Sequence, residues 1–505
     1  MADTSAKFDR IMEMVEMGNY FTINRPRQYG KTTMLFQLTA ALRKMDEYLV
    51  FRISFEGVGD AVFENETAFA PMFFRRLMLY AQNTDADLAA YLNDASKNMD
   101  SMETLSTGVS ALVQHCQKKI VLLIDEVDKS SNNQLFISFL GILRDKYLAR
   151  SEQPTFHSVI LTGVHDVKTL KIKISPNSER KLNSPWNIAA DFKVDMNLYP
   201  KEIEPMLKEY AHDRAVQIDC NAIAQHIFYY TSGHPFLVSK LCKIFDEELL
   251  PQKTEKTWTV EDVDTAARQL IGEGSTNFDE IIKNLENNRD LYQLVQTLIL
   301  NEEDLPFNRH EPTINIGIVY GIFTDRNNRL AIHNRIYREM ISNYMTVSLL
   351  IQEKRLPRTE SAQTYLLPGN HWDIKKALRK FQELMRAEYS KKDRDFLERQ
   401  GRLIFLAFLK PILNGHGNAF KEPQISEERR LDLLIAYYQH RYLIELKLWH
   451  GPAAHQKGLD QLADYLEALG LDEGALLIFD HSKTKKQWKE ENIEHKGKRI
   501  FAIWT

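Results

Sequence analysis

Cysteine is scarce in this sequence, and its scarcity narrows the class of protein. Only three cysteines occur among 505 residues, and no two of them lie at the spacing of a metal-ligand pair. We therefore expect neither a disulfide framework nor a zinc site, and a reducing compartment suits this usage.

A large excess of one charge is also absent. The chain has 65 Lys and Arg residues against 69 Asp and Glu residues, which gives a formal net charge of -4. No global field attracts nucleic acid, so any surface that binds it must be local. Hydrophobic residues make up 44% of the chain, enough for several cores, and this composition excludes wholesale disorder.

Long apolar runs are missing as well. A transmembrane helix needs roughly 20 apolar residues in succession, and the longest strongly apolar runs here, such as 120–124, are the size of a strand. Residues 1–18 alternate charged and apolar side chains, which favours a helix over a secretory signal. The sequence therefore predicts a cytoplasmic protein without a membrane partner.

Strand-like and helical segments alternate in the N-terminal third of the chain. Residues 20–24, 48–55, 120–125 and 156–163 are rich in β-branched and aromatic side chains, and longer helical patterns separate them. Such alternation predicts a parallel sheet covered by helices. A mostly helical region follows, and then two strand-like runs joined by a polar turn at 325–328, which we interpret as a winged-helix-like unit.

The first motif with chemical content is RPRQYGKTT, at 25–33, between a strand and an apolar-periodic helix. That context is the one a phosphate loop requires, because backbone N–H groups and the helix N-terminus attract phosphate oxygens. Lys31 is placed to reach the β- and γ-phosphates, and Thr32 offers a hydroxyl to Mg²⁺. Arg25 stands where the full pattern has its first glycine, so only the second half of the motif matches. The residues expected to contact the nucleotide are Arg27, Gln28, Tyr29, Gly30, Lys31, Thr32 and Thr33.

A later apolar strand ends in two acids. Asp125 is expected to hold Mg²⁺, directly or through water, and Glu126 to polarise the attacking water as a catalytic base. Thr162 ends the next strand at the carboxyl edge of the sheet, where ligands of open α/β sheets bind, and is a candidate donor to the γ-phosphate. Three arginines remain open as candidates for an arginine finger: Arg144, Arg150 and Arg180.

These elements, together with LTGVHD at 161–166 and SGHPFL at 232–237, resemble the AAA-like ATPases of bacteria and archaea, relatives of the signal-transducing ATPases with numerous domains. The resemblance covers 8–345. It implies ATP and Mg²⁺ as cofactors, and it places Pro235, in a Gly-x-Pro element of the lid, near the nucleotide. It also implies a homo-oligomer as a candidate assembly, since such ATPases commonly complete their sites in trans.

A second constellation lies in the two strand-like runs of 429–449. If the turn between them falls at 439–440, Asp432 lies directly opposite Lys447, and Glu445 shares the strand face of Lys447. Opposed Cβ atoms are about 5 Å apart, so the three side chains converge within reach of one divalent ion. Two carboxylates suit Mg²⁺ or Mn²⁺, and a lysine stabilises the charge that builds on a phosphodiester.

The following helix carries Gln461 and Tyr465, four positions apart and therefore on one face. With the aspartate and the Glu-x-Lys element of the hairpin, this pair resembles the PD-(D/E)xK nuclease superfamily over 377–504. The resemblance implies a metal-dependent nuclease whose metal site holds the aspartate, the glutamate and often an acid from the first helix. For that acid, Glu398 is the candidate and Glu422 the runner-up.

Basic side chains outnumber acidic ones in 370–402 and in 482–499, which favours local contact with a phosphate backbone. DNA is the partner that we expect first, and RNA and the strandedness of the substrate stay open. Trp488 and Trp504 either stack on bases or belong to a core.

The two constellations predict an α/β multidomain protein in which the nucleotide state of an ATPase gates a nuclease that depends on Mg²⁺ or Mn²⁺. The alternative is a nucleotide-switched scaffold or sensor that binds nucleic acid or partners without cleavage. The expected domains are an AAA-like P-loop ATPase core at 1–195, a helical lid at 196–285, the winged-helix-like unit at 286–349, a linker at 350–371 and a restriction-endonuclease-like PD-(D/E)xK domain at 372–505.

Overall fold

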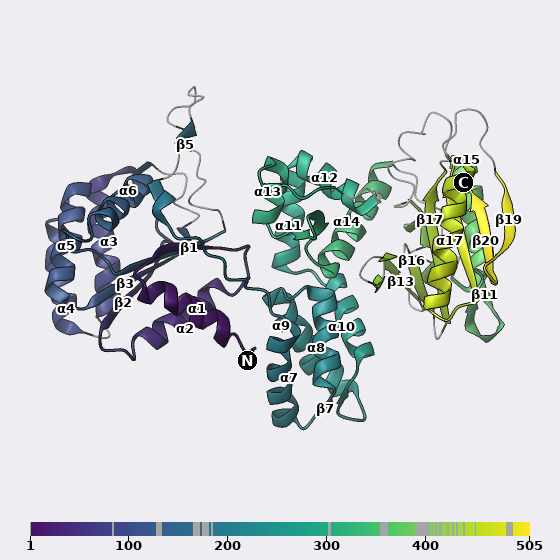
Figure 1. The fold of residues 1–505 in the computed structure, drawn as a ribbon, viewed down its shortest axis with the longest axis horizontal. Coiled ribbons are helices and arrows are strands. Elements are labelled where there is room, and N and C mark those ends of the chain that lie inside the picture. The colour runs from purple at the N-terminus through teal and green to yellow at the C-terminus, as the bar shows by residue number, and fades with distance from the viewer. Residues whose placement is uncertain are drawn as a thin grey trace. The chain divides into compact units, whose positions relative to one another are not determined.

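The computed structural model divides the chain into two compact units. The first combines Met1–Asn284 with Phe307–Ile336, and the second combines Leu285–Pro306 with Tyr337–Thr505. Figure 1 shows their helices and strands, coloured from purple to yellow along the chain. The residues that the structure describes are 2–82, 85–127, 134–164, 172–173, 181–182, 185–300, 305–353, 362–388, 404–406, 408–409, 412–413, 417–421, 424–426, 429–430, 433–437, 440–449, 451–480 and 488–505.

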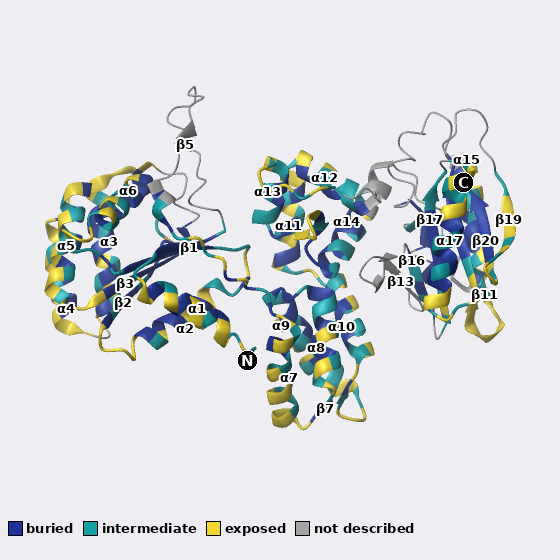
Figure 2. Cartoon of the chain, in the orientation of Figure 1, coloured by how far each residue is buried: buried dark blue, intermediate teal, exposed yellow. Residues whose placement is uncertain are grey.

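Four parallel strands form the central sheet of the first unit, in the order β1-β4-β3-β2. Their bounds are β1 (Tyr20–Asn24), β2 (Tyr48–Ser54), β3 (Lys119–Asp125) and β4 (Ser158–Gly163). The two central strands are buried almost throughout, as a parallel sheet covered on both faces requires (Figure 2). The parallel sheet predicted from the sequence is confirmed.

Helices cover both faces of this sheet (Figure 1). One face carries α1 (Ser5–Glu16) and α2 (Lys31–Leu42). The other face carries α3 (Glu66–Ala81), α4 (Ala86–Lys97), α5 (Met102–Cys116) and α6 (Gln134–Leu148). Because all four strands are parallel, their carboxyl ends meet at one edge of the sheet.

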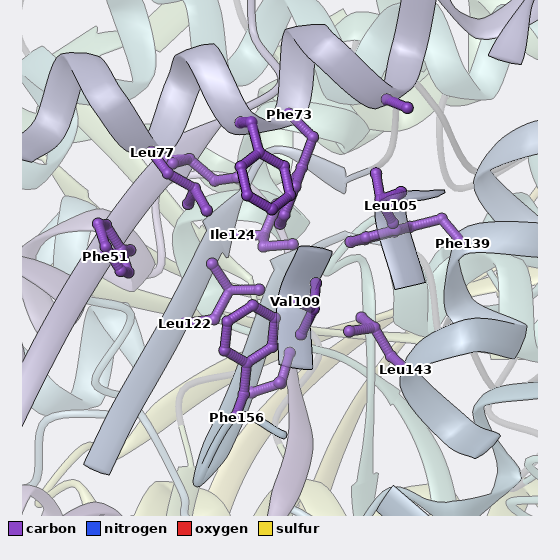
Figure 3. Close-up of a cluster of buried hydrophobic side chains, with 14 of the residues drawn as sticks. Phe51, Phe73, Leu77, Leu105, Val109, Leu122, Ile124, Phe139, Leu143 and Phe156 are labelled. Carbon is purple, nitrogen blue, oxygen red and sulfur yellow. The ribbon is translucent and has the colours of Figure 1, made fainter. Parts of the chain in front are cut away.

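Each face of the sheet has its own apolar core. Val121 and Leu123 pack on the side of α1 and α2, whereas Leu122 and Ile124 pack on the other side. This alternation follows from the two-residue period of a strand. Figure 3 shows the second core, in which side chains of β3 meet those of α3, α5 and α6.

A helical region follows the sheet in the first unit. Its elements are α7 (Pro200–Arg214), α8 (Cys220–Thr231), α9 (Pro235–Ile244) and α10 (Val260–Gly272), with the short parallel pair β7 (Gln217–Ile218) and β8 (Thr257–Trp258). Ser232 and Gly233 separate α8 from α9 with φ angles of 46° and 77°, and Pro235 then starts α9. Proline suits this position because the first helical residue needs no N–H donor. The helical region is thus interrupted at the SGHPFL motif, between α8 and α9.

A β-hairpin and four helices come next in the chain. They are α11 (Thr276–Asn287), α12 (Arg289–Leu300), α13 (Pro312–Val319), β9 (Phe323–Arg326), β10 (Arg329–Ile332) and α14 (Arg335–Glu353). Of the β-branched residues before the turn, those at 314–319 belong to a helix, and the strand begins only at Phe323. Glu311 caps that helix, because its carboxylate accepts a hydrogen bond of 2.6 Å from the backbone N of Ile314. Asn327 and Asn328 form the turn of the hairpin with positive φ, as a two-residue turn requires.

Six strands form the sheet of the second unit, in the order β13-β16-β17-β18-β20-β19. The middle strands β17, β18 and β20 are parallel, and the other neighbours are antiparallel. Their bounds are β13 (Gly417–Lys421), β16 (Leu433–Tyr437), β17 (His440–Leu448), β18 (Glu473–Phe479), β19 (Glu490–His495) and β20 (Lys498–Trp504). The two edge strands, β13 and β19, were not predicted from the sequence.

Helices pack on both faces of the second sheet. Leu459 and Leu462 of α17 (Pro452–Ala468) lie in one core with Ile478. On the other face, the ring of Phe381 in α15 (Ile374–Glu388) lies 6.3 Å from the ring of Phe479. The remaining described strands are short: β5 (Ile172–Lys173), β6 (Lys181–Leu182), β11 (Leu366–Leu367), β12 (His371–Trp372), β14 (Gln424–Ser426) and β15 (Arg429–Arg430). Over the described parts of the chain, helices with both the length and the apolarity to span a bilayer are absent.

Candidate functional sites

The loop between β1 and α2 turns sharply before the helix begins. Gln28 and Gly30 have φ angles of 60° and 73°. A Cβ atom at Gly30 would meet nothing within 4 Å, so glycine is needed there for its backbone conformation and not for space. The first turn of α2 starts at Lys31 and carries no acidic residue, so its N–H groups present an electropositive end that suits a phosphate.

Arg25 replaces the usual first glycine without disturbing this loop. Its backbone is not in the left-handed region, so a side chain is tolerated. Its guanidinium donates hydrogen bonds to the carbonyl oxygens of Asn24 at 2.8 Å and Val194 at 2.6 Å, and it lies 5.4 Å from the ring of Phe192. The departure from the motif therefore anchors the loop to the segment that precedes α7.

Lys31 lies across the loop. Its Nζ donates to the carbonyl oxygens of Arg25 at 2.8 Å and Pro26 at 2.9 Å. These acceptors hold the ammonium group beside the positive end of α2, where phosphate oxygens could take their place. Thr33, the neighbouring hydroxyl, is exposed.

Asp125 joins the carboxyl edge of the sheet to the start of α2. Its Oδ2 accepts a hydrogen bond of 2.9 Å from Thr32 Oγ1, and its Oδ1 accepts a short one from the buried hydroxyl of Thr162. Asp125 as a whole is 8% exposed. Thr162 therefore orients Asp125 in this structure, whereas Thr32 remains exposed to solvent.

The oxygens of Thr32 and Asp125 fit a divalent ion. In an octahedral Mg²⁺ site with Mg–O distances of about 2.0–2.1 Å, two adjacent ligands lie about 2.9 Å apart. The separation of Thr32 Oγ1 and Asp125 Oδ2 is 2.9 Å, so both atoms could bind one ion with little rearrangement. The donor set is also all oxygen, which Mg²⁺ prefers.

Glu126 occupies a strained backbone position directly after Asp125. Its φ of 58° costs a residue other than glycine about 1 kcal/mol, and its N–H donates to Asp125 Oδ1 at 3.0 Å. Strain of this kind is concentrated at functional sites. Of the arginine-finger candidates, Arg150 lies 4.0 Å from the ring of Tyr147, Arg144 is half-buried, and Arg180 is outside the described residues.

Two histidines that contact the phosphate loop were not predicted from the sequence. Tyr29 is only 4% exposed, and its hydroxyl lies 2.7 Å from Nε2 of His333, after β10. Its ring also meets His234, with 4.4 Å between centroids. Pro235 starts α9 directly after His234, so the Gly-x-Pro element meets the loop through the histidine. An isolated histidine has no neighbouring sequence pattern that would predict its contacts. The hydrogen bond between Tyr29 and His333 joins residues 304 positions apart in the sequence.

The second constellation lies on the α17 face of the second sheet. Leu443 packs in the core under α17, and Glu445 and Lys447 share its strand face. Lys447 Nζ lies 3.0 Å from Glu445 Oε1, and the side chains are 19% and 2% exposed. Gly458 of α17 lies beside the lysine: a Cβ there would make an ordinary contact of 3.4 Å with Lys447 Cγ.

The predicted register of the β16–β17 hairpin is wrong by two residues. Tyr437 pairs with His440 and Leu433 with Ile444, so the turn is one residue earlier than expected. His440 is held in the strand because its ring stacks on His371 at 3.6 Å. A shift of two keeps every side chain on its predicted face, so Glu445 and Lys447 still point together. Three predicted site residues fall outside the described part of the chain: Asp432, Glu398 and Glu422.

The accessory pair and the tryptophans can be placed in part. Tyr465 is buried in the core under α17, and Gln461 is half-buried on the same helix. Trp504 is 1% exposed and belongs to that core, so it cannot stack on a base, while Trp488 is half-buried. A group of three or more His, Cys, Asp or Glu side chains able to hold a metal is not found among the residues described.

Comparison with known proteins places the chain in a family. The model of the AAA-like domain matches residues 5–343. A search among curated proteins finds no match. Among solved structures, the chain is similar to a Walker-type ATPase of Pyrococcus abyssi, with 12% identity, 68% of this chain and 96% of that chain covered, and a TM-score of 0.46.

Two further solved structures are similar over comparable lengths. The RuvB Holliday junction branch migration motor of Thermotoga maritima has 14% identity, with 67% of this chain and 95% of that chain covered and a TM-score of 0.35. The ORC1 protein of Aeropyrum pernix, solved in complex with DNA, has 13% identity, with 69% and 94% covered and a TM-score of 0.31. Because the matched family model spans more than half of the 505 residues, from α1 to α14, the chain belongs to the AAA-like domain family.

Proposed function

We propose that this protein binds and hydrolyses ATP at the loop between β1 and α2, and that its nucleotide state gates phosphodiester cleavage by the second unit. The observation that carries the ATPase part is the contact of 2.9 Å between Thr32 and Asp125, at the electropositive start of α2. The nuclease part rests on the buried Glu445–Lys447 pair. The gating rests on the presence of both sites in one chain.

In the ATPase step, the residues have separate tasks. The N–H groups at the start of α2 and the ammonium of Lys31 bind the phosphates. Thr32 and Asp125 would hold Mg²⁺, which neutralises charge on the β- and γ-phosphate oxygens when bound. Thr162 keeps the Asp125 carboxylate in place through its hydrogen bond. Glu126 accepts a proton from the attacking water as that water approaches the γ-phosphate.

In the cleavage step, Glu445 and Asp432 would hold Mg²⁺ or Mn²⁺ and Lys447 would stabilise the phosphate charge. A glutamate that is 2% exposed loses its hydration, and a lysine beside it offsets only part of that loss. Such a pair is hard to explain as a contribution to stability alone. A metal ion would add positive charge beside the Glu445 carboxylate, and a phosphodiester would add negative charge beside the Lys447 ammonium. Gln461 and Tyr465 lie on the helix that covers this face.

The direct test measures cleavage of plasmid and linear DNA with Mg²⁺ or Mn²⁺, in the presence and absence of ATP. We expect Glu445→Gln and Asp432→Ala to abolish cleavage, and Glu473→Gln, an exposed glutamate on β18, to leave it intact. Lys31→Ala should remove the effect of ATP, while Lys44→Ala, an exposed lysine after α2, should retain it. Cleavage by Lys31→Ala that responds to ATP as the wild type does would contradict gating.

A nucleotide-switched scaffold is the second candidate. The observation that favours it is Arg25, whose hydrogen bonds to the carbonyl oxygens of Asn24 and Val194 fix the loop where the full motif has a glycine. It predicts slow hydrolysis and ATP-dependent binding of nucleic acid. Binding or assembly that requires ATP, with no cleavage under any metal condition, would select this function.

A further inference from the structure

One side chain of the phosphate loop is buried against the segments that begin α9 and follow β10. Tyr29 is 4% exposed, whereas the adjacent Arg27 and Gln28 are exposed. Its hydroxyl lies 2.7 Å from Nε2 of His333, and its ring meets the ring of His234 edge-on with 4.4 Å between centroids. A single residue of the loop thus contacts both the start of α9 and the end of β10.

The two imidazoles are buried and neutral at pH 7. Burial lowers the pKa of His333 to about 4 and the pKa of His234 well below its ordinary value. Asn334 Nδ2 lies 3.3 Å from His333 Nδ1, and an amide nitrogen can only donate. With the Asn334 amide in this orientation, Nδ1 of His333 accepts and Nε2 donates to the oxygen of Tyr29.

Other contacts hold the loop to the same neighbours. Gly321, between α13 and β9, has a φ of 73°, and a Cβ there would lie 2.9 Å from the ring of Pro26. Arg27 Nε lies 3.1 Å from Glu280 Oε1 in α11, but both side chains are exposed, so this pair contributes little. Gly321 and the ring of Pro26 lie close together, but their contact is apolar. The hydrogen bond at Tyr29 is thus a directional contact between the loop and the residue that follows the hairpin.

The hairpin is in turn joined to the helices that follow the sheet. Arg326, at the end of β9, donates to Ser232 Oγ at 3.5 Å and to the carbonyl oxygen of His333 at 3.4 Å. Ser232 lies two residues before His234 in the turn between α8 and α9. The two histidines that contact Tyr29 therefore belong to segments that also contact each other.

We propose that Tyr29 is a positioning residue of the nucleotide site, which couples the conformation of the phosphate loop to the β9–β10 hairpin through His333 and to α9 through His234. The inference rests on the proposed ATP binding and adds the route by which the loop and the hairpin affect each other. Nucleotide affinity depends on the hydrogen bond of His333 with Tyr29, because a loop released from it samples conformations that do not bind phosphate. By reciprocity, bound nucleotide stabilises the hairpin.

The test measures, on the full chain, the affinity for a fluorescent ATP analogue and the kcat and KM of ATP hydrolysis. We expect Tyr29→Phe and His333→Ala each to weaken affinity about threefold to tenfold, as the loss of one hydrogen bond predicts. The double variant should lose no more than either single variant, since both remove the same contact. His333→Gln should recover most of the affinity, because its amide can donate to Tyr29.

Tyr20→Phe is the matched control. Tyr20 is a buried tyrosine of β1 whose hydroxyl donates to the carbonyl oxygen of Phe156 at 3.0 Å, away from the loop. We expect this variant to lower thermal stability and leave nucleotide affinity and KM unchanged. If Tyr29→Phe behaves like Tyr20→Phe, Tyr29 has only a structural role and the proposal is overturned.

The failure of this proposal can be told from the failure of ATP binding. A wild-type chain that binds ATP, with Tyr29→Phe binding it equally well, overturns the positioning role alone. A folded wild-type chain that binds no ATP overturns both. Additive losses in the double variant would show that the two residues act separately, and they too would overturn the coupling.

Discussion

The carboxylate of Asp125 has three donors, and only one of them is exposed. Thr162 and the N–H of Glu126 hold Oδ1 from within the protein, while Thr32 holds Oδ2 at the surface. Oδ2 is therefore the oxygen that accepts from a hydroxyl on an exposed residue, and an ion can also bind that hydroxyl. Such an arrangement fixes one half of the carboxylate and leaves the other half free to exchange a hydrogen bond for a metal ligand.

Asp125→Asn should separate nucleotide binding from hydrolysis. An amide keeps the shape and can still accept from Thr162, but it binds Mg²⁺ weakly. We expect kcat to fall by about 100-fold or more, with a much smaller change in affinity for ATP without metal. Release of phosphate is the measurement, and Asp46→Asn, an exposed aspartate before β2, is the control. Full hydrolysis by Asp125→Asn would exclude this carboxylate from the metal site.

His333 should make the fold sensitive to acid. Burial lowers its pKa to about 4, below the value of about 6.5 in an unfolded chain. Between these two values the unfolded chain binds the proton and the folded chain does not, so the free energy of unfolding falls as the pH falls from 6.5 towards 4. The contribution of His333 to this fall is at most about 3 kcal/mol.

His333→Gln tests this pH dependence, because glutamine does not titrate. Urea unfolding at pH 7, 6 and 5 should show a smaller loss of stability for this variant than for the wild type. His310→Gln, at an exposed histidine before α13, should follow the wild type. Equal pH dependence in all three proteins would show that His333 is not buried in its neutral form.

At the scale of elements, the strands that were predicted and those that were missed differ in burial. β3 and β4 are central, and their continuous apolar runs predict them without any knowledge of neighbours. β19 is an edge strand whose side chains are mostly exposed, so its sequence, EENIEH, has no core-facing pattern. A hydrophobic period in the sequence indicates which side chains are buried. The edge strand β19 buries few side chains, so it has no such period.

The β16–β17 hairpin shows that the apolar pattern of a sequence also does not determine the pairing register of two strands. When the pairing register of two strands shifts by two residues, every side chain stays on the same face of the sheet. The apolar pattern therefore does not distinguish the predicted register from the observed one. The stacking of His371 on His440 distinguishes them, and those residues are 69 positions apart in the sequence. The face of Glu445 and Lys447 was therefore predictable, and the residue opposite each of them was not.

The turn between α8 and α9 should be intolerant of any side chain at Gly233. Its φ is 77°, and a Cβ there would lie 2.4 Å from the carbonyl oxygen of Leu198, which is backbone and cannot move aside. We expect Gly233→Ala to lower the free energy of unfolding by about 2–4 kcal/mol. Gly141, inside α6, has nothing within 4 Å of its Cβ position, so Gly141→Ala should raise that free energy by about 0.5–1 kcal/mol. Chemical denaturation of both variants measures these two changes in the free energy of unfolding. If Gly233→Ala is as stable as the wild type, the turn differs from the one described.

At the scale of the whole molecule, the two compact units should unfold in two transitions. Each unit has its own apolar cores, and chains with more than one such unit commonly depart from two-state unfolding. Calorimetry of the full chain is therefore expected to resolve two peaks. A single sharp transition would show that the units unfold as one.

ATP then distinguishes a coupled protein from two independent units. A ligand at 100 times its Kd raises the free energy of unfolding of the unit that binds it by about 2.7 kcal/mol. If the nucleotide state gates the second unit, the coupling free energy is reciprocal, and the second transition must also move, typically by about 1–3 kcal/mol. We expect ATP with Mg²⁺ to shift both transitions in the wild type and in Lys44→Ala, and neither in Lys31→Ala. A shift of the first transition alone would support ATP binding and contradict gating. In that case the coupling free energy between bound ATP and the second unit would be zero.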